Sequence, residues 1–483
     1  MHPAIILRVL GVLLMIYSTT MLPPVAVALY YHDGGHVQFL TAFGITLISG
    51  LICWLPVHSR RDELRVKDGF LVVVLFWTVL GLYGAIPFLL GDEPNMGVAD
   101  AVFESISGLT TTGATVLQHL DGLPKSILYY RQQLQWLGGM GIIVLAVAIL
   151  PMLGIGGMQL YRAETPGPMK DHKLTPRIAE TAKALWTLYV CLTFVCAITY
   201  WILGMGIFDA VTHSFSTIAI GGFSTHDDSI GYFNNPAIEV ATIIFMAIAG
   251  INFGLHFLAW RRKELTHYWA DPELRFYFQV LIGISAIACA VLYFNGTYEN
   301  PWDGMRHAIF QTVSIATTTG YSVADSSQWH PLIPTALLMG SFIGACAGST
   351  GGGMKAIRML LMFKQGLREM RRLMHPNAIM VIKLNNKAVP DRVIEAVWGF
   401  FGIYLMAFCV LFLAILATGI DFVSAFSAVA ACMNNLGPGL GEVALNYSSI
   451  SDTAKWILCF TMLLGRLEIF TLLILFTPMF WRH

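Results

Sequence analysis

The sequence predicts an all-α polytopic membrane protein, in which two leading helices precede four repeats of helix, short half-helix and helix. Three observations support this prediction. Hydrophobic residues make up 56% of the 483 residues, charged residues only 12%, and the mean hydropathy is +0.66. Apolar stretches long enough to cross about 30 Å of hydrocarbon recur along the chain. Four short polar segments, each ending in glycine, lie between them.

We expect ten membrane-spanning stretches, near residues 4–30, 38–57, 70–91, 129–151, 184–204, 236–259, 275–294, 333–363, 392–418 and 454–480. We interpret the first as a retained helix, because it lacks a small-residue cleavage site. Ten crossings place both termini on one side, and roughly 24 of the 29 lysines and arginines fall there. Prominent basic clusters include residues 170–177 and 364–387. The positive-inside rule therefore predicts cytoplasmic termini.

Carboxylates are distributed in the opposite sense, with many on the outer side of the membrane. The acids that we place there are Asp92, Glu93, Asp100, Asp121, Asp227, Asp228, Glu299, Asp303 and Asp325. An anionic outer vestibule would concentrate cations. Simple tolerance of acids on the outside would explain the same pattern.

The four glycine-terminated segments align with one another. Each begins with alanine and reaches glycine twelve positions later, over 101–113, 210–222, 308–320 and 425–437. We expect half-helices near 100–110, 209–218, 307–317 and 424–433, too short to span, that dip into the membrane and return. A second glycine follows in the next apolar stretch, at Gly138, Gly250, Gly344 and Gly465. Four copies of one unit predict a pseudo-four-fold pore, with helix carboxyl ends directed at a cation.

These repeats divide the chain into five parts. We expect two N-terminal transmembrane helices over 1–68, followed by repeats over 69–182, 183–272, 273–390 and 391–483. The third repeat contains an intramembrane glycine loop. The eight cysteines include no Cys-x-x-Cys pair, so we interpret them as apolar residues rather than as disulfide or metal ligands.

Four strips of four residues carry the predicted chemistry: Thr110-Thr111-Thr112-Gly113, Ala219-Ile220-Gly221-Gly222, Thr317-Thr318-Thr319-Gly320 and Asn434-Asn435-Leu436-Gly437. A desolvating cation needs several oxygens at a fixed radius, which backbone carbonyls supply without charge. Glycine permits the backbone angles that turn successive carbonyls inward, while threonine stiffens the strip and can add a hydroxyl oxygen. Neutral oxygens favour a large monovalent ion over a divalent one. Potassium, with rubidium as its mimic, is the first choice, and the residues leave sodium open. We expect Asn434 and Asn435 to hold the fourth strip by side-chain hydrogen bonds.

Together with the strips, three motifs carry a family resemblance: Leu-Gly-Gly-Met-Gly-Ile at 137–142, Gly-Ser-Thr-Gly-Gly-Gly-Met-Lys at 348–355 and Asn-Asn-Leu-Gly-Pro-Gly-Leu at 434–440. Over essentially its whole length the chain resembles the membrane subunit of the bacterial Trk potassium-uptake family, within the Trk/Ktr/HKT superfamily. The resemblance implies a fold related to potassium channels, a homodimer in the inner membrane, and a cytoplasmic nucleotide-binding (TrkA-like) regulatory subunit. It also places Thr111-Thr112, Ile220-Gly221, Thr318-Thr319 and Asn435-Leu436 at the ion sites. The chain lacks the Thr-Val-Gly-Tyr-Gly of true potassium channels, so we expect fewer ion sites and looser selectivity.

The third repeat contains five glycines within ten residues: Gly344, Gly348, Gly351, Gly352 and Gly353. Each costs a helix about 1 kcal/mol relative to alanine. We therefore expect a mobile loop beneath the strips that can block or clear the path. Close helix packing through small residues is the alternative. The family resemblance agrees with the first interpretation, since it implies an intramembrane gating loop here.

Ionisable residues at membrane depth are costly and point to function. Arg466 could pair with a carboxylate, form an electrostatic barrier, or contact the glycine loop; a structural pair with Glu468 is the alternative, although residues i and i+2 do not share a helix face. We expect Lys355 at the cytoplasmic exit. We interpret Glu104 as a brace behind its strip rather than an ion ligand, and His213 as a satisfied polar residue rather than a proton relay.

Two functions remain open from the sequence. The first is channel-like conduction of potassium, gated by the glycine loop and a regulatory partner. The second is symport with protons or sodium, which would need a second cation site or a titrating acid in the path; the strips contain no acid. We expect no enzyme, because the apolar segments hold no His-Glu-x-x-His, paired aspartates or Ser-Lys arrangement. We expect no organic cofactor and no nucleic-acid partner.

Overall fold

The computed structural model describes residues 2–59, 65–144, 178–385 and 387–482, and the regular secondary structure in these ranges is almost wholly helical. Their strands form one short antiparallel hairpin, β1 (Lys383–Leu384) with β2 (Lys387–Ala388). The basic cluster expected at 170–177 lies outside the described residues, as does the far end of the stretch 129–151.

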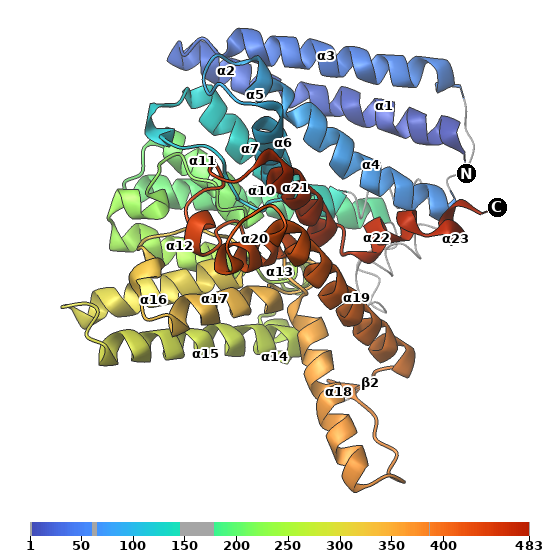
Figure 1. Cartoon of the computed structure of the whole chain (residues 1–483), viewed down its shortest axis with the longest axis vertical. Coiled ribbons are helices and arrows are strands. Elements are labelled where there is room, and N and C mark those ends of the chain that lie inside the picture. The colour runs from blue at the N-terminus through green and yellow to red at the C-terminus, as the bar shows by residue number, and fades with distance from the viewer. Residues whose placement is uncertain (1, 60–64, 145–177, 386, 483) are drawn as a thin grey trace.

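The leading helices pack side by side at one edge of the molecule (Figure 1). Helices α1 (Pro3–Thr19) and α2 (Leu22–Tyr31) form one apolar span, and α3 (His36–Trp54) returns along α1. The two backbones touch at Gly11 and Gly50, since a Cβ on either would lie 2.8 or 2.9 Å from the other's carbonyl oxygen. Small residues at such a crossing allow helices to approach closely in lipid.

The rest of the chain repeats one order of elements four times. The first helices are α4 (Val66–Gly84) with α5 (Ile86–Leu90), α10 (Ile178–Ile202), α15 (Pro272–Phe294) and α19 (Asp391–Leu416). The half-helices are α6 (Val98–Leu109), α11 (Ile207–Ala219), α16 (Pro301–Ala316) and α20 (Phe422–Asn434). The second helices are α7 (Lys125–Val144), α12 (Pro236–Ala249) with α13 (Phe253–Arg262), α17 (Leu332–Ile343) with α18 (Ala356–Met374), and α21 (Asp452–Arg466) with α22 (Phe470–Leu473). Short helices α14 (Thr266–Ala270) and α23 (Pro478–Trp481) complete the chain. The predicted fold class is confirmed.

The half-helices are too short to cross a bilayer, as expected. They contain 12 to 16 residues, and at 1.5 Å per residue they reach roughly 18–24 Å. The fourth is capped by Asp421, whose carboxylate accepts bonds from the N–H groups of Val423 and Ser424. Such a cap satisfies N–H groups that the first turn leaves open.

Two stretches expected to be continuous spans are bent, and the third repeat is interrupted where the glycine run predicted a loop. Among the described residues, six helices are long and apolar enough to cross a membrane on their own. Helices α12 and α13 meet at 92°, α21 and α22 at 111°, and residues 344–355 separate α17 from α18. The local causes are visible. Asn252 caps a new helix by accepting from the N–H of Gly254, while Glu468 and Ile469 both have positive φ. A hydropathy window does not register such bends.

Candidate cation pathway

All four half-helices end in the same local structure. The third residue of each strip donates its N–H to the carbonyl five residues earlier, from Thr112 to Ser107, Gly221 to Ser216, Thr319 to Ser314 and Leu436 to Ala431, at 2.8–2.9 Å. The residue before it is left-handed: φ is 55° at Thr111, 54° at Ile220, 69° at Thr318 and 54° at Asn435. This is the Schellman closure of a helix. Left-handed β-branched residues are strained outliers, and such strain concentrates at functional sites.

The glycine that ends each strip touches the neighbouring strip. All four have φ between 79° and 95°. A Cβ added to Gly113 would lie 2.1 Å from Gly221 O, and one added to Gly222 would lie 1.9 Å from Thr319 O. A Cβ added to Gly320 would lie 2.4 Å from Leu436 O, and one added to Gly437 would lie 2.7 Å from Thr112 O. Each glycine thus faces the third carbonyl of the next strip, and the fourth strip closes on the first. The four strips form a ring, with equivalent carbonyls at equivalent places.

Five of the six threonine hydroxyls in the strips have protein partners. Those of Thr110 and Thr112 lie 2.7 Å apart, and those of Thr317 and Thr319 lie 2.8 Å apart. The hydroxyl of Thr318 accepts the N–H of Gly352 at 2.7 Å. These side chains therefore stiffen the strips, and the backbone carbonyls are the oxygens best placed to replace a cation's water.

The two asparagines of the fourth strip form the expected hydrogen bonds. Asn434 accepts from the Tyr404 hydroxyl at 2.6 Å and donates to Ser341 at 3.1 Å. Asn435 donates to the hydroxyl of Thr112 at 2.9 Å, and to the carbonyl of Met462 at 3.0 Å. Through Asn435 the last strip is bound directly to the first.

A brace lies behind three of the strips. In each of these repeats, a half-helix side chain forms a hydrogen bond with a side chain just beyond the strip. The half-helix residue lies three positions after the alanine that opens the repeat segment, and its partner lies two positions after the strip's glycine. The pairs are Glu104 with Thr115 at 3.0 Å, His213 with Ser224 at 3.0 Å and Gln311 with Ser322 at 3.3 Å. The fourth repeat has Ala428 there, and Ser427 instead accepts the N–H of Leu440 at 2.8 Å. Glu104 and His213 thus form the hydrogen bonds expected of a brace and of a satisfied polar residue.

Two supporting residues were missed by sequence reasoning. The repeat alignment itself contains Gln311, at the position of Glu104 and His213, so that signal was available. Gln135 had none. From α7 it donates to Gly221 O at 2.7 Å and accepts the N–H of Phe223 at 3.0 Å, so it holds the second strip on both sides.

Arg131 and Glu104 form a buried ion pair behind the first strip. Their N–O distance is 2.7 Å and both side chains are at most 1% exposed. Arg131 also donates to Ser224 O at 3.1 Å. Arg131→Met should lower the free energy of unfolding by about 3–5 kcal/mol, because it leaves a carboxylate buried without its partner. Denaturant titration of the detergent-purified protein measures this change.

The matched control removes an exposed ion pair. Arg372 bonds to Glu369 at 3.3 Å, and the two side chains are 54% and 49% exposed. Arg372→Met should therefore cost about 1 kcal/mol or less. Equal losses in the two variants would contradict the special role assigned to the buried pair.

The glycine-rich segment of the third repeat is a loop rather than a helix. Its N–H groups at Gly352 and Gly353 donate to the Thr318 hydroxyl at 2.7 Å and to Asn434 O at 3.0 Å. Thr350 donates to Ile218 O at 2.9 Å. A Cβ on Gly352 would lie 1.9 Å from Asn434 O. The loop therefore lies directly against the ends of three half-helices.

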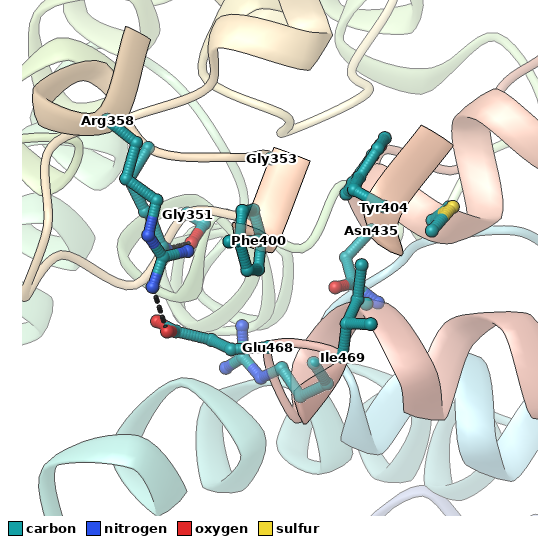
Figure 2. A pocket seen from close by; sticks show the side chains of 13 residues that line it. Gly351, Gly353, Arg358, Phe400, Tyr404, Asn435, Glu468 and Ile469 are labelled. Carbon is teal, nitrogen blue, oxygen red and sulfur yellow. Dashed lines mark hydrogen bonds and ion pairs between the residues drawn. The ribbon is translucent and has the colours of Figure 1, made fainter. Parts of the chain in front are cut away.

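Arg466 contacts this loop. It donates to Thr350 O at 3.2 Å and to Gly138 O at 2.9 Å, which joins the loop to α7. The alternative pairing with Glu468 is wrong: the positive φ of Glu468 ends α21, and its carboxylate binds Arg358 (Figure 2). No carboxylate of the described residues lies within ion-pair distance of Arg466.

Lys355 is buried within the loop. Its side chain is 7% exposed and donates to the carbonyl of Gly351, within the loop itself. The positive φ of Lys355, 77°, marks the turn from the loop into α18. A lysine buried at this position satisfies loop carbonyls that have no helical partner.

Comparison with known proteins identifies the family. Residues 35–483 match the family model TrkH, described as "Cation transport protein". The chain belongs to the TrkH family. It is 57% identical over 479 residues to the Trk system potassium uptake protein TrkH of Vibrio parahaemolyticus, with 99% of each chain covered. It is 56% identical over 483 residues to the protein of that name in Escherichia coli K12, with full coverage of both. The crystal structure of the potassium transporter TrkH from Vibrio parahaemolyticus matches with a TM-score of 0.92, at 54% identity and full coverage.

The loop of this TrkH-family chain leaves little space beneath the ring. A cavity of about 30 Å³ lies between the loop glycines 351–353, Asn435, Arg466 and α19 (Figure 2). That volume has room for only a few water molecules. The second-helix glycines explain the close fit. A Cβ added to Gly138 would lie 1.8 Å from Leu109 O, and one added to Gly465 would lie 2.2 Å from Met433 O. These two carbonyls occupy corresponding positions in their half-helices.

One histidine links the first and second repeats beyond the ring. His226 binds Asp121 through Nδ1, and its Nε2 lies 3.5 Å from Asp209. Burial lowers the pKa of His226, but the two carboxylates outweigh it and raise the pKa above its ordinary 6.5. Burial likewise opposes ionisation of Asp209, yet bonds from His226 and Thr225 lower its pKa from 3.8 to about 2.

This cluster predicts a pH-dependent stability. Protonated His226 contributes stability fully below pH 6.5 and loses it as pH rises through its raised pKa. Ionised Asp209 contributes above pH 3.8 and loses its part as pH falls toward 2. The difference in thermal unfolding midpoint between wild type and His226→Gln should therefore be largest between pH 3.8 and pH 6.5 and shrink at alkaline pH. A difference independent of pH would contradict this assignment.

Proposed function

We propose that this chain is the potassium-translocating subunit of a Trk-type uptake system and conducts K⁺, and its mimic Rb⁺, in a channel-like manner. The observation that supports this most directly is the closed ring, in which four equivalent carbonyls each lie beside the glycine of a neighbouring strip. Neutral oxygens at fixed places favour a weakly hydrated monovalent cation. The relatives named as potassium uptake proteins agree with this choice.

In this proposal the ring is the selectivity filter. Its ion-binding residues are Thr111, Thr112, Gly113, Ile220, Gly221, Gly222, Thr318, Thr319, Gly320, Asn435, Leu436 and Gly437. The glycine loop and the arginine that holds it form the gate: Gly344, Gly348, Gly351, Gly352, Gly353, Lys355 and Arg466. The contacts of the loop with Thr318 and Asn434 support this role, because the loop occupies the space directly beneath the filter.

The proposal extends to the protein's setting. Two leading helices (1–68) and four pore repeats (69–182, 183–272, 273–390, 391–483) lie in the bacterial inner membrane with both termini cytoplasmic, as the distribution of basic residues indicates. The functional unit is a homodimer with a cytoplasmic nucleotide-binding (TrkA-like) regulatory subunit. The family resemblance supports both partners. The chain carries K⁺ as its transported ion and uses no organic cofactor.

The test is ⁸⁶Rb⁺ uptake into proteoliposomes that contain this chain alone, with potassium, sodium and proton gradients imposed in turn. Uptake driven by the potassium gradient, and competed by K⁺ more than by Na⁺, is the expected result. Uptake that requires a proton or sodium gradient would instead establish symport. Glu104 is not available as the coupling acid of that mechanism, because it is already bound to Arg131 behind the filter.

A further inference from the structure

A basic hollow lies beside the start of α15. Figure 1 shows α14 and this end of α15 next to the place where α18 leaves the body of the protein. It has a volume of about 630 Å³ and is lined by Trp269, Ala270, Arg275, Lys364, Lys383 and Asn385. These residues come from α14, α15, α18 and the β1–β2 hairpin. Three of the six are cations and none is an acid.

Hydrogen bonds between the segments build this hollow in advance. Asn385 donates to Ala270 O at 2.6 Å, and accepts from Arg275 at 3.4 Å. Lys364 donates to Lys383 O at 2.7 Å. The hairpin is thereby attached to both α14 and α18, and the three cations are held around one space.

Among the described residues these three cations have no ion-pair partner, unlike two other arginines of α18. On α18, Arg358 pairs with Glu468 and Arg372 with Glu369. No ion pair joins Arg275, Lys364 or Lys383 to any acid in the part of the chain that the structure describes. Asp271 attracts Arg275 electrostatically without forming an ion pair with it, and its carboxylate caps α15 by accepting the N–H of Leu274 at 2.9 Å. One nearby carboxylate does not balance three cations, which repel one another unless a further anion joins them.

The surroundings indicate that this anion belongs to a lipid. Helix α15 is an apolar span of 23 residues, so the hollow at its first turn lies at a membrane surface. Trp269 is 79% exposed there, and Leu265 and Trp260 nearby in the chain are 73% and 65% exposed. Tryptophan beside basic residues is typical of the level of lipid headgroups.

We propose that this hollow binds the phosphate of an anionic phospholipid, with Arg275, Lys364 and Lys383 around the headgroup and the acyl chains beside Trp269. Free phosphate shares the headgroup chemistry but gains nothing from the tryptophan. The site is independent of the cation pathway, so its test does not depend on conduction.

Native mass spectrometry of the detergent-purified full chain tests the site. Phosphatidylglycerol, phosphatidylcholine and soluble glycerol phosphate are added in separate arms. We expect phosphatidylglycerol to bind most tightly, and the triple variant Arg275→Gln/Lys364→Gln/Lys383→Gln to lose about tenfold or more of that affinity. Trp269→Ala should weaken the lipid but not glycerol phosphate. The single variant Lys383→Gln changes an exposed position and should lose about fivefold of the phosphatidylglycerol affinity. It replaces the triple variant as the test if the triple variant does not fold.

The matched control removes three exposed cations elsewhere on the same face, as Arg262→Gln/Lys263→Gln/Arg371→Gln. It should retain phosphatidylglycerol affinity within about twofold. Equal losses in the two triple variants would reduce the effect to general surface charge and overturn the proposal. Equal binding of phosphatidylcholine, or displacement of the lipid by glycerol phosphate at comparable concentration, would overturn it as well.

Discussion

Gly222→Ala is expected to reduce the preference for K⁺ over Na⁺ by about tenfold or more, while Gly34→Ala leaves it unchanged. The two glycines have nearly the same backbone, with φ of 81° and 80°. Both substitutions carry the cost of a left-handed non-glycine residue, roughly 1–2 kcal/mol. Only at Gly222 does the new Cβ collide with the ring, 1.9 Å from Thr319 O; at Gly34 nothing lies within 4 Å.

Selectivity changes in this variant because the collision moves a coordinating carbonyl. A displacement of a few tenths of an ångström at one wall alters the radius at which oxygens replace water. Gly113→Ser and Gly320→Ser should have the same effect, since their Cβ atoms would lie 2.1 and 2.4 Å from the next strip's carbonyl.

The measurement is ⁸⁶Rb⁺ uptake into proteoliposomes, with K⁺ and Na⁺ as competitors. Thermal unfolding in detergent verifies that each variant is folded. An unchanged K⁺ preference in a folded Gly222→Ala protein would mean that the ring is not the filter. Equal damage from Gly34→Ala would assign the effect to backbone strain alone.

The second large effect is expected from the glycine loop. Deletion of residues 348–353 should raise ⁸⁶Rb⁺ flux through the chain alone by about tenfold, because the loop occupies the space beneath the ring and is held there by hydrogen bonds to Thr318 and Asn434. Arg466→Gln should give a smaller increase in flux. It removes only the guanidinium that joins Thr350 O to Gly138 O.

A deletion of equal length provides the control. Residues 376–381 are an exposed connection between α18 and β1, away from the ring. Their removal should leave the flux of the chain alone unchanged. If deletion of 348–353 leaves flux the same or lowers it in correctly folded protein, the loop is not the barrier. A rise in flux with both deletions would indicate a general loosening of the structure.

Sequence patterns located most of the functional backbone. The four-fold alignment identified the half-helices, the strips and their glycines, and the glycine run at 344–353 identified the loop. These features depend on local properties, namely hydropathy, repeat spacing and the freedom of glycine to adopt positive φ. The bends at Gly250 and at Glu468 were missed, since an apolar stretch has the same hydropathy whether it is straight or broken.

Partnerships between distant residues could not be predicted in this way. Glu468 was a candidate partner of Arg466 by proximity in sequence, but it binds Arg358, 110 residues away. Gln135 holds a carbonyl 86 residues further along the chain. Neither distance leaves a pattern that a single sequence can display, because the partners come from different repeats.

By itself, the sequence determined that this protein is a helical membrane protein with four equivalent strips and an interrupted helix. Each of these properties belongs to a short segment and its immediate neighbours. Only the tertiary structure decided that Gly113, Gly222, Gly320 and Gly437 each face the next strip's carbonyl, and that Arg466 holds the loop. Those contacts exist because four repeats pack around one axis, and packing, unlike helix formation, is settled between segments far apart in the chain.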